Sequence, residues 1–283
     1  MKKIVSSAFA LLLSVSLFTG CAQNNENGNA QGNEGAAGQG QEKVTLIVGA
    51  SPVPHAEILQ QVKPLLEKEG ITLDIKEFTD YTLPNQALND GQLDANFFQH
   101  LPYLESFNKE HGTKVVPTVA VHFEPIGIYA GKLKSFNDVK EGSTFAVPND
   151  PTNEARALQL LQAQGLIKLP EGAGLDVTAK DIQDNPKKIV IKEFDAAMIP
   201  RMLGEVDFAV INGNYAIDAG LKVKDALAAE DVNSLAAKTY ANILAVREGE
   251  NREAVKKLET ALQSPEVKKF IEEKYEGSVV PMF

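Results

Sequence analysis

An asparagine and an arginine lie at the start of one predicted helix, in a pattern suited to binding a carboxylate. Asp150 is followed by Pro151, a pair typical of the N-cap and first position of a helix. Asn153 and Arg156 are three residues apart, so they share one helix face near its positive end. A guanidinium there can pair with a carboxylate. An arginine on a helix is also common in an ordinary surface salt bridge, and spacing alone favours that interpretation.

A second polar group is expected at the end of a strand. Asn212 directly follows the apolar segment 208–211, so its amide is delivered to a strand end, where its carbonyl oxygen can accept a hydrogen bond from an ammonium group. Taken alone, Asn212 is better interpreted as a turn or N-cap residue. Asn214 is expected to be a helix-start residue.

Four aromatic side chains also lie at predicted strand ends, and together they can form an apolar wall. The residues are Tyr81, Phe98, His100 and Tyr103. Phe97 and Phe98 must face opposite sides of a strand, so one packs in the core and the other faces a cleft. His100 can donate one hydrogen bond to a carboxylate while lying over an apolar chain. An equally good interpretation is that all four are ordinary core or rim aromatics.

Enzyme and cofactor signatures are not found in the sequence. It contains no G-x-S-x-G or H-E-x-x-H motif and no phosphate-binding glycine loop. The single cysteine, Cys21, lies next to an export signal. The histidines have no ligand spacing that would predict a metal site; they are His55, His100, His111 and His122. We therefore expect a binding protein without a cofactor or a metal, rather than an enzyme.

An internal repeat predicts that two similar halves position these residues. Ile-Lys-Glu-Phe occurs at 75–78 and at 191–194, and each copy is followed by a glycine and, three residues later, by Asp94 or Asp207. Each copy is also preceded by an apolar strand and a helix with a 3.6-residue apolar period. Each half is thus predicted to be βαβαβ with a mainly parallel sheet, giving an α/β fold class. The alternative is one long doubly wound sheet.

Two extended segments, 115–130 and 239–246, are predicted to cross between the halves and to form a two-strand hinge that closes on a ligand. Ligands of open parallel sheets bind beyond the carboxyl ends of the strands, where the candidate residues lie. We expect the arginine to come from one half and the asparagine from the other, so that they hold a guest charged at both ends. The predicted lobes are 44–124 with 236–283 (lobe 1) and 125–235 (lobe 2).

The N-terminal region predicts export and a lipid anchor. Residues 1–20 combine Lys2 and Lys3 with an apolar run too short to span a bilayer comfortably, typical of a signal peptide. Cys21 stands where a lipobox cysteine would carry a diacylglycerol; the alternative is a plain signal peptide with an incidental cysteine. Residues 21–43 are predicted to be a flexible tether. Removing the two lysines changes the net charge from −10 to −12, which argues against nucleic acid as a partner.

Five segments resemble the NlpA lipoprotein family, specifically the methionine-binding lipoproteins of ABC importers of the MetQ type. They are VPHAEIL at 53–59, DYTLPNQA at 80–87, LDANFFQH at 93–100, INGNYA at 211–216 and FIEEKYEGSVVP at 270–281. The resemblance covers 44–283 together with the lipobox and tether. It implies a bilobal fold like that of periplasmic binding proteins, with the ligand between the lobes. Gly213 is a departure, because threonine is frequent there in the family.

The resemblance also implies the roles of the site residues and the partners. It places the ligand carboxylate on Arg156 and the amino group on Asn212, with Asn153 nearby. The thioether is placed among Tyr81, Phe98, His100 and Tyr103. The implied protein is a monomer, anchored on the extracytoplasmic face of the cell membrane through Cys21, that delivers methionine to an ABC permease and its ATPase subunit. Alternative ligands are another small amino acid, a methionine dipeptide or a metal ion.

Overall fold

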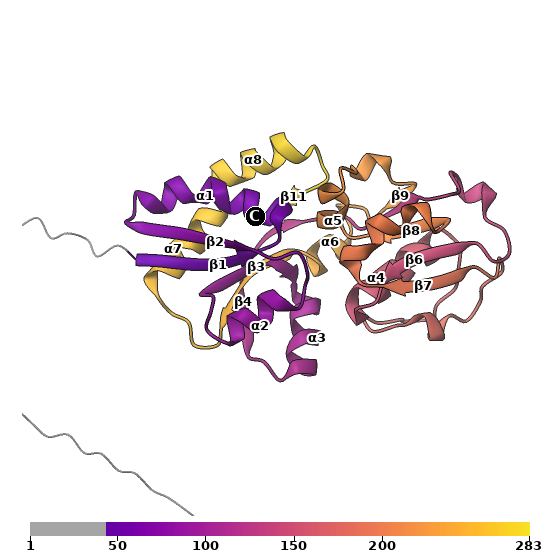
Figure 1. Cartoon of the computed structure of the whole chain (residues 1–283), viewed down its shortest axis with the longest axis horizontal. Coiled ribbons are helices and arrows are strands. Elements are labelled where there is room, and N and C mark those ends of the chain that lie inside the picture. The colour runs from indigo at the N-terminus through magenta and orange to yellow at the C-terminus, as the bar shows by residue number, and fades with distance from the viewer. Residues whose placement is uncertain (1–43) are drawn as a thin grey trace, which may run out of the picture. The chain divides into compact units, whose positions relative to one another are not determined.

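The computed structural model describes residues 44–283, so the predicted signal peptide, Cys21 and the tether lie outside the described residues. A six-stranded sheet is built from both ends of this part of the chain, in the order β11-β4-β10-β3-β1-β2 (Figure 1). We call this sheet and its helices lobe 1. Its strands are β1 (Val44–Ala50), β2 (Ile71–Glu77), β3 (Ala95–His100), β4 (Val115–Phe123), β10 (Asn242–Arg247) and β11 (Val280–Pro281).

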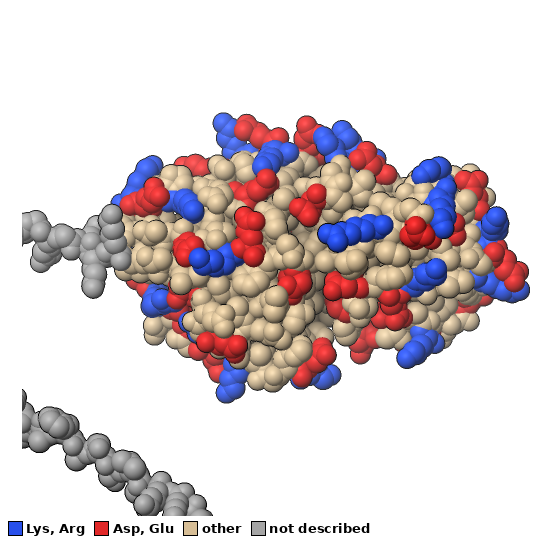
Figure 2. Space-filling model, viewed as in Figure 1, with Lys and Arg blue, Asp and Glu red and all other residues tan. Residues whose placement is uncertain are grey.

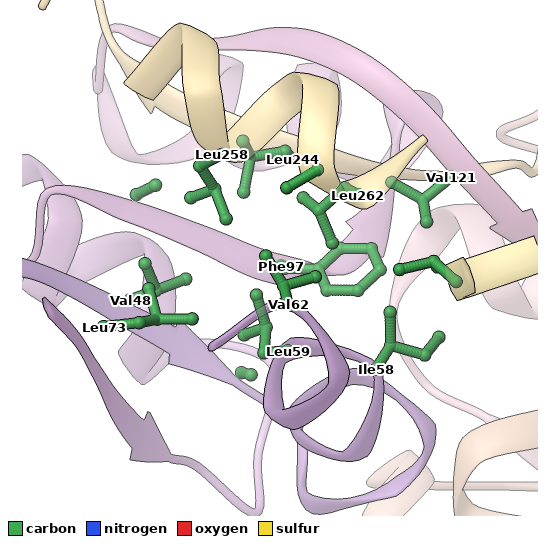
Figure 3. Packing of buried hydrophobic residues seen from close by; sticks show 14 of the residues in the cluster. Val48, Ile58, Leu59, Val62, Leu73, Phe97, Val121, Leu244, Leu258 and Leu262 are labelled. Atoms are coloured by element: carbon green, nitrogen blue, oxygen red, sulfur yellow. The ribbon is translucent and has the colours of Figure 1, made fainter. Parts of the chain in front are cut away.

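Helices cover both faces of the lobe 1 sheet. Ile58, Leu59, Val62 and Leu66 recur at helical spacing and are buried, which turns one face of the first helix to the sheet. They pack with residues of β3, β10 and the C-terminal helices around Phe97 (Figure 3). The opposite face has its own, smaller cluster. The helical elements are η1 (Pro52–Ala56), α1 (Glu57–Glu67), α2 (Leu83–Asn89), α3 (Leu101–His111), α7 (Glu253–Leu262) and α8 (Pro265–Tyr275).

A five-stranded sheet, in the order β7-β6-β8-β5-β9, is the centre of lobe 2 (Figure 1). Its strands are β5 (Gly127–Ala130), β6 (Thr144–Pro148), β7 (Val190–Phe194), β8 (Phe208–Ile211) and β9 (Ala228–Ala229). Its helical elements are η2 (Phe136–Asp138), α4 (Pro151–Ala163), η3 (Ala179–Asp181), η4 (Ala196–Gly204), α5 (Gly213–Asp218) and η5 (Val223–Asp225). The prediction of two separate α/β halves is confirmed, and the single long sheet is wrong.

The two halves share one topology. The order β2-β1-β3 in lobe 1 matches β7-β6-β8 in lobe 2, all with parallel neighbours. The two repeated aspartates, Asp94 and Asp207, make equivalent hydrogen bonds. Asp94 Oδ2 accepts from the backbone N–H of Ile47, and Asp207 Oδ2 accepts from that of Thr144, each at 2.7 Å. Both bonds join the start of the third strand to the first strand, so the sequence repeat is a structural repeat.

Both sheets are mixed rather than mainly parallel. β10 pairs antiparallel with β3 and β4, and β5 pairs antiparallel with β8 and β9. The reason is the connection between the lobes. A strand that enters a sheet from the other lobe does not need the helical crossover that sets parallel direction.

The chain crosses twice between the sheets. It leaves β4 at Phe123 and enters β5 at Gly127, so residues 124–126 form the outgoing crossing. It returns after β9 through residues 230–241, which include α6 (Leu235–Thr239), and enters β10 at Asn242. The return segment predicted to be extended from 239 is therefore extended only from 242. The short outgoing crossing and the longer return crossing are the only covalent links between the two sheets within residues 44–283.

Two properties of the described region bear on binding to nucleic acid and on crossing a membrane. On the face drawn in Figure 2, basic and acidic side chains are interspersed and no broad basic patch is seen. None of the helices in residues 44–283 has both the length and the apolar character needed to cross a membrane.

Candidate functional site

A cavity of about 340 Å³, open solvent at its mouth included, lies between the two lobes. All seven residues predicted from the sequence line it. The complete lining is Tyr81, Phe98, Gln99, His100, Tyr103, Glu124, Asn153, Arg156, Asn212, Gly213, Asn214 and Asn242.

The two key polar residues come from the same lobe. Arg156 lies on α4, which follows β6, and Asn212 is the N-cap of α5 directly after β8, which pairs with β6 in the lobe 2 sheet. The expectation that they come from different halves is therefore wrong. Neighbouring parallel strands of one sheet end at the same edge, and this brings both side chains to one place. Lobe 1 supplies Tyr81, Phe98, His100 and Tyr103 instead.

The start of α4 is built as the sequence predicts. Asp150 is the N-cap and accepts from the backbone N–H of Asn153 at 3.0 Å, and Pro151 occupies the first turn. Asn153 and Arg156 are 1% and 4% exposed, so their shared face is turned into the protein. The interpretation of Arg156 as part of a surface salt bridge is thereby excluded.

The guanidinium of Arg156 is held along one edge. Its Nε and Nη2 donate to the two carboxylate oxygens of Glu230 at 2.7 and 2.5 Å, and Nη2 also donates to the backbone carbonyl of Glu124 at 2.8 Å. None of these bonds uses Nη1. Burial lowers the pKa of Arg156, but the charge and hydrogen bonds of Glu230 outweigh it and raise the pKa. Arg156 is therefore a fixed cation with Nη1 left for a further acceptor.

A chain of directed hydrogen bonds orients Asn212. His100 Nδ1 accepts from the backbone N–H of Tyr103 at 3.2 Å, so the proton of the neutral ring is on Nε2, which faces Asn153 Oδ1 at 3.2 Å. Asn153 Nδ2 donates to Asp150, and its Oδ1 also accepts from Asn212 Nδ2 at 2.8 Å. Asn212 Oδ1 is then enclosed without a hydrogen-bond partner among the described residues. It is an acceptor available to a ligand donor.

His100 has a different role from the one expected. Burial, assisted by the charge of Arg156, lowers the pKa of His100 to about 3, so its ring is neutral near pH 7. Its one N–H is directed to Asn153 rather than to the cavity. His100 thus fixes the amide of Asn153, and through it Asn212, while its ring lines the cavity.

Three aromatic rings pack together at the lobe 1 side of the cavity. The centroid of Tyr81 is 6.0 Å from that of Phe98 and 5.6 Å from that of Tyr103. Phe97 is fully buried in the lobe 1 core while Phe98 lines the cavity, so the two faces alternate as predicted. The wall is apolar apart from its hydroxyl groups.

Residues after Asn212 approach lobe 1 closely. Asn214 is more than a helix-start residue, because its Oδ1 accepts from the Tyr81 hydroxyl across the cavity at 2.6 Å. A Cβ on Gly213 would lie 2.6 Å from Cβ of Glu124. The glycine at this position therefore matches the close approach of Glu124.

Sequence reasoning missed two acids. Glu124 is 5% exposed and lines the cavity, and Glu230 pairs with Arg156. Burial raises the pKa of Glu124, while His55 and Arg156 lower it. The sequence contains only a weak signal for these two acids. Each acid directly follows an apolar run that leaves a sheet, at 115–123 and 226–229.

Two of the four histidines converge, contrary to expectation. His122 Nε2 is 2.6 Å and His55 Nε2 is 3.4 Å from Glu124 Oε1, and His55 Nε2 is 3.0 Å from Asn242 Oδ1. Burial lowers the pKa of His55 to about 4 and that of His122 to about 3. Within residues 44–283, neither of the two buried Nδ1 atoms has a hydrogen-bond partner. A metal on Nε2 would leave two buried N–H groups unpaired, whereas metal-bound histidines normally donate that proton. The cluster fits a metal poorly.

Known proteins share this architecture. The curated methionine-binding lipoprotein MetQ of Bacillus subtilis (strain 168) is 39% identical over 288 residues, covering 100% of this chain and 99% of that protein. A nutrient binding protein from Burkholderia cenocepacia, solved bound to methionine, has a TM-score of 0.80 and 49% identity over 84% of this chain and 100% of its own.

A third relative is an ABC transporter periplasmic substrate-binding protein from Coxiella burnetii, with a TM-score of 0.78 and 42% identity over 84% of this chain and 100% of its own. The model of the family described as NlpA lipoprotein matches residues 46–283. With a full-length relative, solved structures and the family model in agreement, the chain belongs to the NlpA lipoprotein family.

Proposed function

We propose that this chain is the lipid-anchored solute-binding component of an ABC importer. It captures methionine in the cavity between the lobes and delivers it, as a monomer, to a membrane permease and its ATPase subunit. A lipid on Cys21 holds it on the extracytoplasmic face of the cell membrane, and its work is binding rather than catalysis.

One observation carries the proposal: a single cavity is lined by Arg156, whose Nη1 makes no hydrogen bond among residues 44–283, by Asn212 with its unpaired amide oxygen, and by an aromatic wall. These groups complement an amino acid that is charged at both ends and has an apolar side chain. The ligand carboxylate pairs with Nη1 of Arg156, and the ammonium donates to Oδ1 of Asn212. Glu124 lines the same cavity and packs against Gly213, the residue after Asn212.

The aromatic wall accounts for the side chain. A thioether makes favourable contacts with aromatic rings about 5 Å away, and Tyr81, Phe98 and Tyr103 form such a surface. Burying the chain contributes roughly 1.5–3 kcal/mol. The names of the relatives from Bacillus subtilis and Burkholderia cenocepacia support methionine as the amino acid.

A ligand panel tests the proposal. Thermal unfolding is measured with each amino acid, with a methionine dipeptide and with divalent metal ions, and native mass spectrometry identifies any ligand that co-purifies. Methionine at 100 times its Kd is expected to stabilise the protein by about 2.7 kcal/mol, with smaller shifts for other amino acids. A larger shift with the dipeptide or a metal ion, or none with methionine, would refute the assignment.

A further inference from the structure

We infer that Glu230 is a positioning residue for ligand recognition: it fixes the guanidinium of Arg156 so that Nη1 is presented to the ligand carboxylate. The inference rests on the proposed function and adds to it a residue that does not line the cavity. Glu230 contacts the ligand-binding arginine rather than the ligand, and it lies at the beginning of the return crossing, 74 residues from Arg156.

The in-plane contacts leave the guanidinium one orientation. Glu230 accepts from Nε and Nη2 of Arg156 with both of its carboxylate oxygens. The second N–H of Nη2 goes to the carbonyl of Glu124 in the outgoing crossing. Oε2 of Glu230 also accepts from the backbone N–H of Ile126, in the same outgoing crossing, at 3.0 Å. A two-bond pair of this kind fixes direction as well as charge.

Aromatic rings hold the guanidinium from its faces. The Cζ of Arg156 is 4.4 Å from the ring centroid of Tyr240 in the return crossing and 5.5 Å from that of Phe123 at the end of β4. The arginine is thus held by groups from both crossings, in its plane and across it. Its free Nη1 is aimed by the same residues that connect the lobes.

The charge of buried Arg156 accounts for a carboxylate as its partner. Arg156 is 4% and Glu230 10% exposed, and an unpaired buried cation would be costly without a ligand. Glu230 neutralises the arginine in the ligand-free protein without occupying Nη1. A neutral partner of the same shape, such as glutamine, would offer one acceptor instead of two and would set an N–H donor against the guanidinium.

The test compares methionine with methioninamide, which lacks the carboxylate, in the wild-type protein and in Glu230→Gln. Displacement of the Arg156 guanidinium would weaken the binding of methionine but not that of methioninamide. Calorimetry is expected to show methionine affinity lowered at least about tenfold in Glu230→Gln, with the preference for methionine over the amide reduced by a similar factor. A merely structural role would weaken both ligands alike and leave the preference unchanged.

Two further variants complete the experiment. Glu230→Asp retains the charge and is expected to recover part of the preference even if Glu230→Gln folds poorly. Glu141→Gln, which removes a carboxylate from an exposed ion pair with Lys188 in lobe 2, is expected to bind as the wild type does. The inference is overturned if methionine affinity rises in Glu230→Gln, since Glu230 would then compete with the ligand, or if the preference is unchanged in Glu230→Gln and Glu230→Asp. Failure of the wild type to bind methionine would instead refute the proposed function.

Discussion

At the scale of single residues, the site is defined by direction as much as by residue type. One backbone N–H, that of Tyr103, selects the tautomer of His100, and the bonds that follow leave Asn212 Oδ1 without a hydrogen-bond partner among residues 44–283. Each side chain in this hydrogen-bond series donates or accepts according to its neighbour, so substituting one of them changes the orientation of the Asn212 amide. The neighbours of Asn212 therefore determine that its oxygen, rather than its NH₂ group, is left unpaired.

Asn212→Ala is expected to weaken methionine binding at least about tenfold, or about 1.4 kcal/mol, because the acceptor for the ligand ammonium is lost. Calorimetry checks this, with the exposed Asn137→Ala in the same lobe as the matched control.

Arg156→Ala is expected to weaken methionine binding by at least as much as Asn212→Ala, and also to destabilise the fold because it leaves Glu230 buried without its partner. Near-native affinity in both variants would contradict the site.

Residue types were predictable from the sequence, whereas their partners were not. The pair Asp150-Pro151 predicts the start of a helix, so Asn153 and Arg156 could be placed on one helix face. Glu230 could not be identified, because a glutamate after an apolar run is common and the contact spans 74 residues. His55 and His122 meet only through the fold, so their sequence spacing carried no information about the cluster they form.

At the scale of elements, the sequence repeat was informative because it includes hydrogen-bonding residues. Asp94 accepts from β1 and Asp207 accepts from β6, the first strand of each repeat, so the repeat is structural as well as a similarity of sequence. The strands β5 and β10, which run against their neighbours β8 and β3, could not be predicted from the repeat, since they lie outside it. Their direction depends on how the chain crosses between the lobes.

Asp207→Asn is expected to lower the free energy of unfolding by about 1–3 kcal/mol. Asp207 Oδ2 accepts from both the backbone N–H and the hydroxyl of Thr144, and an amide can reproduce this only in part. Urea denaturation measures the effect. Methionine affinity should be unchanged, because Thr144 begins β6 whereas the cavity lies beyond the other end of that strand. A variant as stable as the wild type would show that the bond contributes little.

At the scale of the whole described region, three hydrogen bonds join the lobes around the cavity. Tyr81 donates to Asn214, Tyr215 donates to the carbonyl of Thr79, and His100 faces Asn153. Only the two crossings connect the sheets covalently within residues 44–283. Two further contacts join the lobes away from the cavity: the backbone N–H of Val223 donates to Ser278 Oγ at 3.3 Å, and Lys222 pairs with Glu276 at 3.5 Å. Two covalent crossings of this kind suit hinge motion.

Small-angle scattering is expected to show a smaller radius of gyration when methionine is added to the ligand-free protein, because the ligand joins groups from both lobes. Asn212→Ala at the same methionine concentration serves as the control and should compact less. An unchanged radius of gyration in the wild type at saturating methionine would contradict ligand-driven closure.

The division of the cavity between the lobes bears on the order in which a ligand contacts them. Arg156 and Asn212 belong to lobe 2, and under the proposed function they bind the carboxylate and the ammonium that all amino acids share. The aromatic surface proposed to contact the ligand side chain belongs to lobe 1. If the proposed function holds, an amino acid can bind lobe 2 first through its carboxylate and ammonium groups, and its side chain meets the aromatic surface only when the lobes close. A ligand whose side chain does not fit lobe 1 would then fail to close the lobes, and a permease that accepts only the closed form would not receive it.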